Sequence, residues 1–276
     1  MSIPSNFQFT QGNLQDYVDC PRRFQLRYLL QRAWPAPQAE PLAEAERRME
    51  MGQAFHRLVY QHMLGIPADV LTRSVTDPDL ARWWHNYLTT PPPALPSQLR
   101  RAEIVLSAPL SDYRLVAKYD LVAATPGERL VIVDWKTGQC RPARSTLESR
   151  LQTRLYRYLL VEAGTPLNEK QPVKPEQVQM VYWFAEYPTQ PEYFPYDTAQ
   201  FLADSDYLRR LIAEIGQHEE EVWSLTQDEC LCLFCYYRSL CARKVIAGPL
   251  NDLADEQAIA PTDFDVDLEQ VAEIAF

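Results

Sequence analysis

The sequence predicts an α/β fold in which helices flank a central mixed β-sheet. Apolar residues recur at helical spacing before residue 91 and after residue 197. In between, the period changes, and short strand-like runs surround a single helical stretch. One run, Leu130 to Val133, is apolar at every position, which is typical of a strand buried on both faces. We therefore expect the sheet core at about 100–196.

The chain before the sheet is predicted to be helical. Within the helical pattern of 11–31, Pro21 follows Cys20 and suits the first turn of a second helix. A proline-rich linker at 34–37 precedes a long helix over 40–63, which Gly65-Ile66-Pro67 ends. Another helix is expected over 76–90, before three consecutive prolines.

Strands are expected over 101–108, 113–124, 128–135, 177–186 and 191–196, with helices over 147–163 and 198–222. These elements predict a single domain over 1–248, with a helical part at about 34–99. Its two ends, 11–31 and 228–245, carry cysteines, and an acidic tail follows over 249–276.

The formal net charge of −10 at first argues against a nucleic-acid partner. However, residues 251–276 hold eight acids and no base, which leaves −2 for residues 1–250. Within that body, 136–160 carries six bases against Glu148 alone, a local charge of +5. The acidity is thus concentrated in the tail, and the body has a basic stripe at 136–160.

Composition and the N-terminus predict a cytoplasmic protein with no membrane partner. Apolar residues make up 46% and charged residues 23%, which excludes wholesale disorder. No apolar run approaches the roughly 18 residues of a membrane span, and the N-terminus lacks the regions of a secretory signal. In that reducing compartment the six cysteines are not expected to form disulfides.

The buried strand ends in the most informative motif, Asp134-Trp135-Lys136-Thr137-Gly138. Because strand side chains alternate, Asp134 and Lys136 project from one face and Trp135 from the other. A carboxylate and an ammonium at the end of a buried strand incur a desolvation cost that packing does not require. The pair is either functional or a structural ion pair.

Asp120 ends the preceding strand, so a hairpin of the two strands would bring Asp120 and Asp134 together. Two neighbouring carboxylates repel each other unless a cation lies between them. Hard oxygen ligands of this kind select Mg²⁺ or Mn²⁺.

Two helices carry further polar candidates. His56 follows Gly52 by one helical turn, and the missing side chain of Gly52 lets another backbone come close. Gln152 and Tyr156 are four residues apart, so they share a face of the helix that follows the Asp134 strand.

Four features follow one another along the chain: His56, Asp120, Asp134-Trp135-Lys136 and Gln152-x-x-x-Tyr156. As a set, they resemble the PD-(D/E)XK nuclease superfamily, and specifically its RecB-like branch. The strand bearing Asp120 reads Val-Ala-Lys-Tyr-Asp-Leu, where relatives often have glycine and an Asp-Arg pair. The resemblance implies a restriction-endonuclease-like sheet and a metal-dependent DNA nuclease, an exonuclease on single strands or DNA ends. It implies a role in DNA repair and recombination or in CRISPR spacer acquisition.

The resemblance also implies roles for the site residues. The ligands of Mg²⁺ or Mn²⁺ would be His56, Asp120, Asp134 and the backbone carbonyl of Trp135. Lys136 would position the attacking water and stabilise negative charge. Gln152 and Tyr156 would orient Lys136 or the scissile strand. Four arginines of the basic stripe would bind DNA phosphates without reading bases: Arg144, Arg150, Arg154 and Arg157.

The cysteines predict a second site. Cys232, Cys235 and Cys241 form a C-x₂-C-x₅-C pattern, and Cys20 supplies a fourth thiolate. Four thiolates suit a [4Fe–4S] cluster or a tetrahedral Zn²⁺. One early and three late cysteines resemble the iron–sulfur subgroup of RecB-like nucleases, which includes AddB-type nuclease domains and CRISPR spacer-acquisition nucleases, and this favours the cluster. Cys230 competes with Cys232 as a ligand, and the x₂ spacing favours Cys232.

Two other function classes fit parts of this pattern. A non-catalytic nucleic-acid-binding subunit would keep the fold without the chemistry. A zinc-clasped interaction protein would use its acidic tail to mimic DNA or to dock a basic protein partner.

Overall fold

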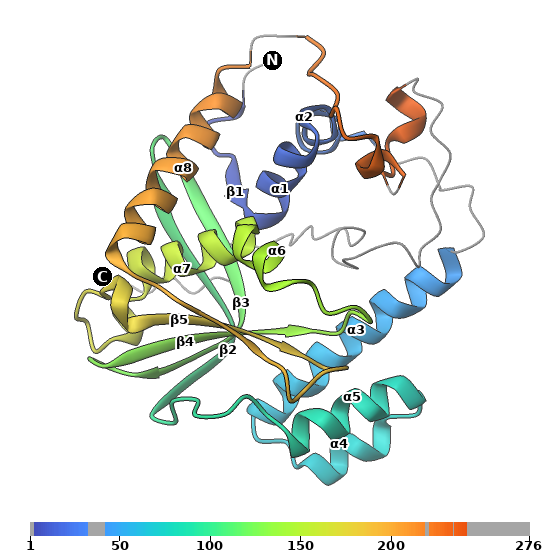
Figure 1. The fold of residues 1–276 in the computed structure, drawn as a ribbon, viewed down its shortest axis with the longest axis vertical. Coiled ribbons are helices and arrows are strands. Elements are labelled where there is room, and N and C mark those ends of the chain that lie inside the picture. Colours follow the sequence, from blue (N-terminus) through green and yellow to red (C-terminus); the bar gives the residue numbers. More distant parts are fainter. Residues whose placement is uncertain (1–2, 33–41, 219–220, 234, 242–276) are drawn as a thin grey trace.

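The computed structural model describes residues 3–32, 42–218, 221–233 and 235–241. Six strands form one mixed sheet at its centre (Figure 1). They are β1 (Gln8–Thr10), β2 (Leu99–Leu110), β3 (Tyr113–Thr125), β4 (Arg129–Lys136), β5 (Val178–Phe184) and β6 (Glu192–Pro195). Neighbours pair antiparallel except β1 with β3 and β4 with β5, which are parallel. The predicted α/β class with a mixed sheet is confirmed.

Helices cover both faces of the sheet (Figure 1). One core contains side chains from α1 (Gln11–Asp19), α7 (Leu151–Ala163) and α8 (Thr198–Gly216), and the other from α3 (Leu42–Met63), α4 (Ala68–Ser74) and α5 (Pro78–Thr89). Short 3₁₀ turns lie at Thr165–Leu167, Pro175–Gln177, Glu229–Cys232 and Arg238–Cys241. Among the described helices, none has the length and apolar character that crossing a membrane requires.

β3 changes partners along one of its edges. β2 pairs with the other edge over almost its whole length, from Leu110 to Leu99. On the edge of β3 opposite β2, β4 pairs with residues 121–125 and β1 pairs with residues 114–116. Asp120 is the residue of β3 next to the segment that pairs with β4, so the β3–β4 pairing ends at a carboxylate and the two strands separate there. This opening positions the polar residues described below.

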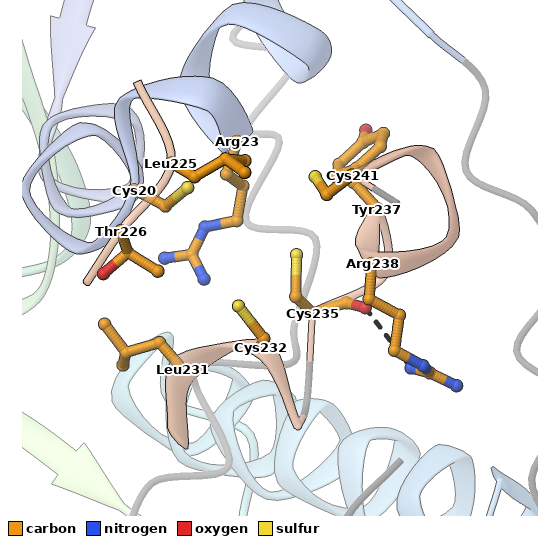
Figure 2. A pocket seen from close by; sticks show the side chains of 10 residues that line it. All are labelled: Cys20, Arg23, Leu225, Thr226, Leu231, Cys232, Cys235, Tyr237, Arg238 and Cys241. Atoms are coloured by element: carbon orange, nitrogen blue, oxygen red, sulfur yellow. Dashed lines mark hydrogen bonds between the residues drawn. The ribbon is translucent and has the colours of Figure 1, made fainter. Parts of the chain in front are cut away.

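The two ends of the described chain lie together on the α1 side (Figure 1). A π-helical turn at Gln25–Leu29 follows α2 (Pro21–Phe24). The side-chain amide of Gln25, which is buried, donates to the Glu221 carbonyl at 2.8 Å and accepts from the Trp223 backbone amide at 3.1 Å. The Trp223 ring stacks on Phe24 with centroids 5.6 Å apart. Cys20 thereby shares a pocket with Cys232, Cys235 and Cys241 (Figure 2).

Several boundaries differ from the sequence predictions. The helix expected over 147–163 is two helices, α6 (Arg144–Ser149) and α7, because Arg150 is extended with ψ of 141°. The helix expected to reach residue 222 ends at Gly216, and the chain turns so that Trp223 can pack on Phe24. β1 and α4 were not expected. The linker at 34–37 and the acidic tail at 249–276 lie outside the described residues.

Candidate active site

α3 brings His56 to the opening in the sheet. A Cβ atom added to Gly52 would lie 3.1 Å from the Thr137 hydroxyl, tighter than ordinary van der Waals contact. Glycine therefore lets this helix lie against the segment that follows β4. One turn later, His56 Nδ1 lies 3.3 Å from Asp120 Oδ1. The other oxygen of Asp120 accepts a hydrogen bond from the Trp135 amide at 2.9 Å.

Asp134, Lys136 and Gln152 form a closed hydrogen-bonded triangle. Lys136 Nζ lies 2.9 Å from Asp134 Oδ2 and donates to Gln152 Oε1 at 2.9 Å. Gln152 Nε2 donates to Asp134 Oδ1 at 2.6 Å. All three are nearly buried, with 4% to 7% of each residue exposed. Trp135 packs in the opposite core, so the predicted alternation along β4 is confirmed.

Tyr156 lies one turn beyond Gln152 on α7 and is also buried. Its ring contacts the Tyr119 ring, with centroids 4.8 Å apart, and its carbonyl accepts from the Tyr119 hydroxyl at 3.0 Å. Burial, followed by the charges of Asp134 and Asp120, raises the pKa of Tyr156 well above its usual value. The hydroxyl therefore stays protonated near the two carboxylates and acts as a neutral group.

The charged groups of the site shift one another's pKa values. Burial alone would lower the pKa of His56, but Asp120 outweighs it and the pKa is raised. Burial would raise the pKa of Asp120, but His56, the Trp135 amide and Lys136 together lower it. The pKa of Asp134 is raised, chiefly by burial and also by Asp120, against the opposing effect of Lys136. Asp120 is therefore the carboxylate that stays ionised most readily.

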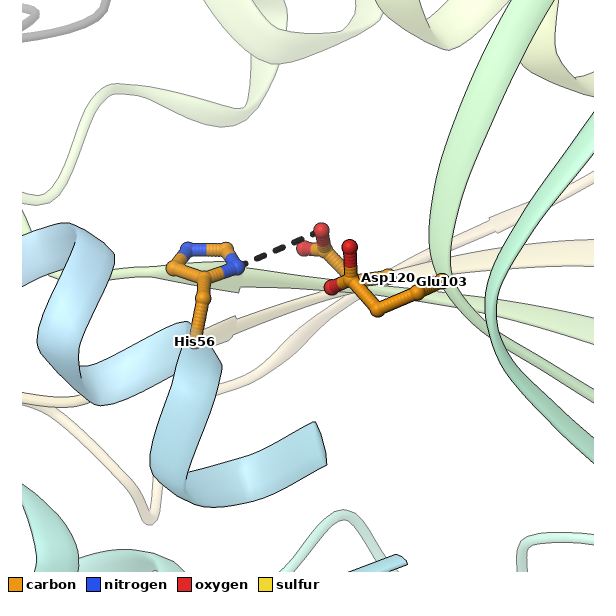
Figure 3. Close-up of side chains that lie close together, drawn as sticks. All are labelled: His56, Glu103 and Asp120. Carbon is orange, nitrogen blue, oxygen red and sulfur yellow. Dashed lines mark ion pairs between the residues drawn. The ribbon is translucent and has the colours of Figure 1, made fainter. Parts of the chain in front are cut away.

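Glu103 on β2 also lies at the site, although no sequence motif predicted it. One ligand atom each from His56, Glu103 and Asp120 lies within 4.8 Å of the others (Figure 3). An imidazole nitrogen and two carboxylate oxygens are donors that Mg²⁺ and Mn²⁺ accept. A signal existed: the tight turn between β2 and β3 sets a register in which Glu103 faces Asp120. Asp134 bonds to Lys136 and Gln152 beside this group.

The predicted DNA-binding arginines fall into two groups. Arg144 is half exposed, lies 2.7 Å from a Glu192 carboxylate oxygen and stacks over Phe194, while Arg154 lies 3.6 Å from Asp204. These two and Arg150 are on or near the surface, and DNA contact by them stays a prediction.

Arg157 does not fit the predicted role. It is 4% exposed, and its guanidinium donates to the carbonyls of Thr153 and Pro195, both at 2.8 Å. It also lies over the Tyr196 ring. The contact with Pro195 joins α7 to β6, and the guanidinium is buried there, so a DNA phosphate cannot reach it in the structure. The prediction for Arg157 was wrong because the sequence alone did not show which face of α7 is covered.

The pocket at the joined chain ends contains the four predicted cysteine ligands. Cys20, Cys232, Cys235 and Cys241 line it, and Figure 2 shows their sulfur atoms pointing into the same space. Cys230 is exposed and its amide donates to Asp228 at 2.9 Å, away from this lining. Burial raises the pKa of Cys235 to about 11. A metal or cluster bound there would have to displace that thiol proton.

Comparison with known proteins gives the family. No curated protein matches the chain in sequence. Solved structures similar to it include the crystal structure of SSO0001, at 12% identity and a TM-score of 0.43, covering 87% of this chain and 88% of the other. Another, a "Putative exonuclease" from Eubacterium rectale, gives 8% identity and a TM-score of 0.46, covering 87% and 90%. Both TM-scores are below 0.5.

The family model of the PD-(D/E)XK nuclease superfamily matches residues 8–242, which is most of the chain. This span includes β1, the sheet, His56, Glu103, Asp120 and the Asp134-Trp135-Lys136 motif. The chain belongs to the PD-(D/E)XK nuclease superfamily.

Proposed function

We propose that this nuclease is a Mg²⁺- or Mn²⁺-dependent exonuclease that degrades single-stranded DNA or DNA ends, and that it belongs to the RecB-like iron–sulfur branch. The observation that carries the proposal is the triangle of Asp134, Lys136 and Gln152 beside the His56–Asp120 pair. It places a cation, a neutral amide and two carboxylates at the point where β3 and β4 separate. Phosphodiester hydrolysis needs such a set, because negative charge develops on the phosphate.

The donors at the site fit a divalent cation. His56 Nδ1 and oxygens of Asp120 and Glu103 lie close together, with Asp134 two strand positions before Lys136. The proposed ligands are His56, Asp120, Asp134 and the Trp135 carbonyl. A divalent ion held there would supply a nucleophilic water at neutral pH and positive charge for the phosphate.

The side chains around these ligands orient the reaction. Gln152 fixes Lys136 Nζ and Asp134 Oδ1 at once, so neither group can rotate away from the other. Lys136 then lies ready to hold the attacking water and to stabilise charge on the phosphate. Tyr156, one turn along α7, keeps a protonated hydroxyl beside the same carboxylates, available as a hydrogen-bond donor to the scissile strand.

We propose that Cys20, Cys232, Cys235 and Cys241, which line one pocket, hold a [4Fe–4S] cluster. Four thiolates suit such a cluster or a tetrahedral zinc, and the resemblance to the iron–sulfur branch favours the cluster. A reducing cytoplasm would keep these thiols available.

DNA would be bound through phosphates by Arg144, Arg150 and Arg154 of the basic stripe, so no sequence preference is expected from them. The acidic tail would dock a basic protein partner or compete with DNA for the stripe. The proposed RecB-like iron–sulfur branch suggests two pathways, DNA repair and recombination or CRISPR spacer acquisition. The genes that flank this one would distinguish between them.

The experiment compares linear and circular single-stranded DNA of the same sequence, with matched duplexes, in Mg²⁺, Mn²⁺ and EDTA. We expect degradation of the linear single strand in either metal, little attack on the circle, and no reaction in EDTA. Phosphorothioate blocks at one end or the other then give the polarity. Rapid cutting of the circle would contradict the exonuclease, and activity in EDTA would contradict the metal dependence.

A further inference from the structure

Glu103 occupies an irregular position in the β2–β3 hairpin. Its backbone φ is +55°, a region that favours glycine, although it is a glutamate within a strand. The ladder pairs Ala102 with Leu121 and Ile104 with Tyr119, and the Glu103–Asp120 pair between them is interrupted. The irregular backbone and the register together place the Glu103 carboxylate beside Asp120 and His56 (Figure 3).

The alternation of β3 shifts at the same point. Tyr119 and Val122 are three residues apart and would face opposite sides of a regular strand, yet both lie in the α7-side core. The shift occurs across Asp120, opposite Glu103. Both strands are therefore irregular at this position, and the outcome is that two carboxylates meet beside His56 of α3.

Glu103 also has a cationic partner. Lys118, two residues before Asp120 on β3, forms an ion pair with a Glu103 oxygen. The side chains of Lys118 and Glu103 are 32% and 20% exposed, so the pair is partly shielded from water. A carboxylate that approaches Asp120 needs a compensating charge, and Lys118 supplies it in the protein without an ion.

We propose that Glu103 is an additional ligand of the divalent ion and that Lys118 competes with the ion for this carboxylate. The inference rests on the proposed function, because it requires the ion at His56 and Asp120. When the ion binds, it takes over the Glu103 oxygen and the ion pair with Lys118 breaks. Glu103 thereby adds a negatively charged ligand, which raises the affinity of the site for the divalent ion. Lys118 reduces this gain, because the ion pair with Glu103 has to break when the ion binds.

The test is direct binding of Mn²⁺, read from the EPR signal of the free ion, without DNA. We expect Glu103→Gln to weaken binding by about tenfold or more, at least the loss that an outer-shell partner causes. Glu103→Asn is the second variant, because asparagine tolerates positive φ better than glutamate. It should keep or raise thermal stability while losing affinity, which a purely structural role would not produce.

A double-mutant cycle tests the competition. Lys118→Met should tighten Mn²⁺ binding in the wild-type background and have a much smaller effect in the Glu103→Gln background. Arg101→Met is the matched control, because it removes one positive charge from β2 two residues from Glu103. Equal effects of Lys118→Met in both backgrounds would overturn the competition, since charge alone would then explain them.

Failure of this inference is distinguishable from failure of the proposed function. If wild-type protein binds Mn²⁺ and Asp120→Asn does not, while Glu103→Gln binds as the wild type does, only the role of Glu103 is overturned. If the wild-type protein binds no Mn²⁺, the metal site itself is overturned and both proposals fall.

Discussion

The ammonium group of Lys136 lies 2.9 Å from the carboxylate of Asp134, two positions earlier on the same buried strand. Each charge compensates the other. Gln152 also accepts a hydrogen bond from Lys136 Nζ and donates one to the second oxygen of Asp134. Removal of either charge leaves the other buried without its counter-charge, which costs more than the pair contributes. The Asp134–Lys136 pair is therefore a determinant of stability.

Lys136→Met should destabilise the protein by about 3–5 kcal/mol, because it leaves the Asp134 carboxylate buried and uncompensated. The double variant Asp134→Asn with Lys136→Met should be considerably more stable than the single variant. Urea denaturation measures both free energies of unfolding. Arg73→Met, which breaks an exposed ion pair with Asp69, is the control and should change stability by about 0.5 kcal/mol or less. A single variant as stable as the wild type would contradict the coupling.

Binding of Mn²⁺ should tighten as pH rises. His56 must be neutral to act as a ligand, and Asp120 raises its pKa above the ordinary 6.5. Below that raised pKa the ion has to displace a proton, so affinity should fall as pH decreases and proton release should accompany binding. Calorimetry in buffers of different ionisation enthalpy measures this release. His56→Gln should abolish the pH dependence in this range, and a pH-independent affinity in the wild type would contradict the role of His56.

Protein purified without oxygen should be brown, with about four irons and four labile sulfides per chain. Cys20→Ala, Cys232→Ala, Cys235→Ala and Cys241→Ala should each remove the colour and lower thermal stability, because the cluster joins distant segments. Cys230→Ala is the matched control and should remain coloured, since Cys230 lies outside the pocket lining. One zinc and no iron would support the zinc clasp instead. Bleaching by Cys230→Ala alone would show that the ligand set is wrong by one residue.

Deletion of residues 251–276 should strengthen binding of single-stranded DNA, because it removes eight negative charges. The gain should shrink with added salt, since exposed charges are screened within about 10 Å at 0.1 M. Fluorescence anisotropy in Ca²⁺ across a salt series measures it. Unchanged affinity at low salt would mean that the tail serves another partner.

The sequence predicted the parts of the fold and the site that depend on local periodicity. Alternation along β4 predicted that Asp134 and Lys136 share a face. Helical spacing predicted that Gln152 and Tyr156 share a face of their helix, and the structure shows that Gln152 contacts Lys136. Glu103 was missed because its place depends on a positive φ, which no motif reveals, and on a strand register that only the tight turn between β2 and β3 indicates.

Errors elsewhere arose where tertiary packing decides the outcome. Arg157 was assigned to the DNA surface, but α7 turns this residue toward the carbonyl of Pro195 on β6. The helix after residue 198 was predicted to be longer, but Trp223 packs on Phe24 instead of extending it. The π-helical turn after α2 positions Gln25 for this contact, and no sequence period signals such a turn.

The most direct test of the account is single-turnover cleavage of an end-labelled single-stranded oligonucleotide in Mn²⁺ by Asp120→Asn and Asp134→Asn. Asp112→Asn, at the exposed turn between β2 and β3, is the control for loss of a carboxylate. We expect both variants to remain folded by circular dichroism, Asp134→Asn with lowered stability, and to lose nearly all activity, because residues that act together in catalysis each cause a nearly complete loss when removed singly. The control should cleave as the wild type does. Wild-type rates in folded Asp120→Asn or Asp134→Asn, with contaminating nuclease excluded, would contradict the assignment of the site.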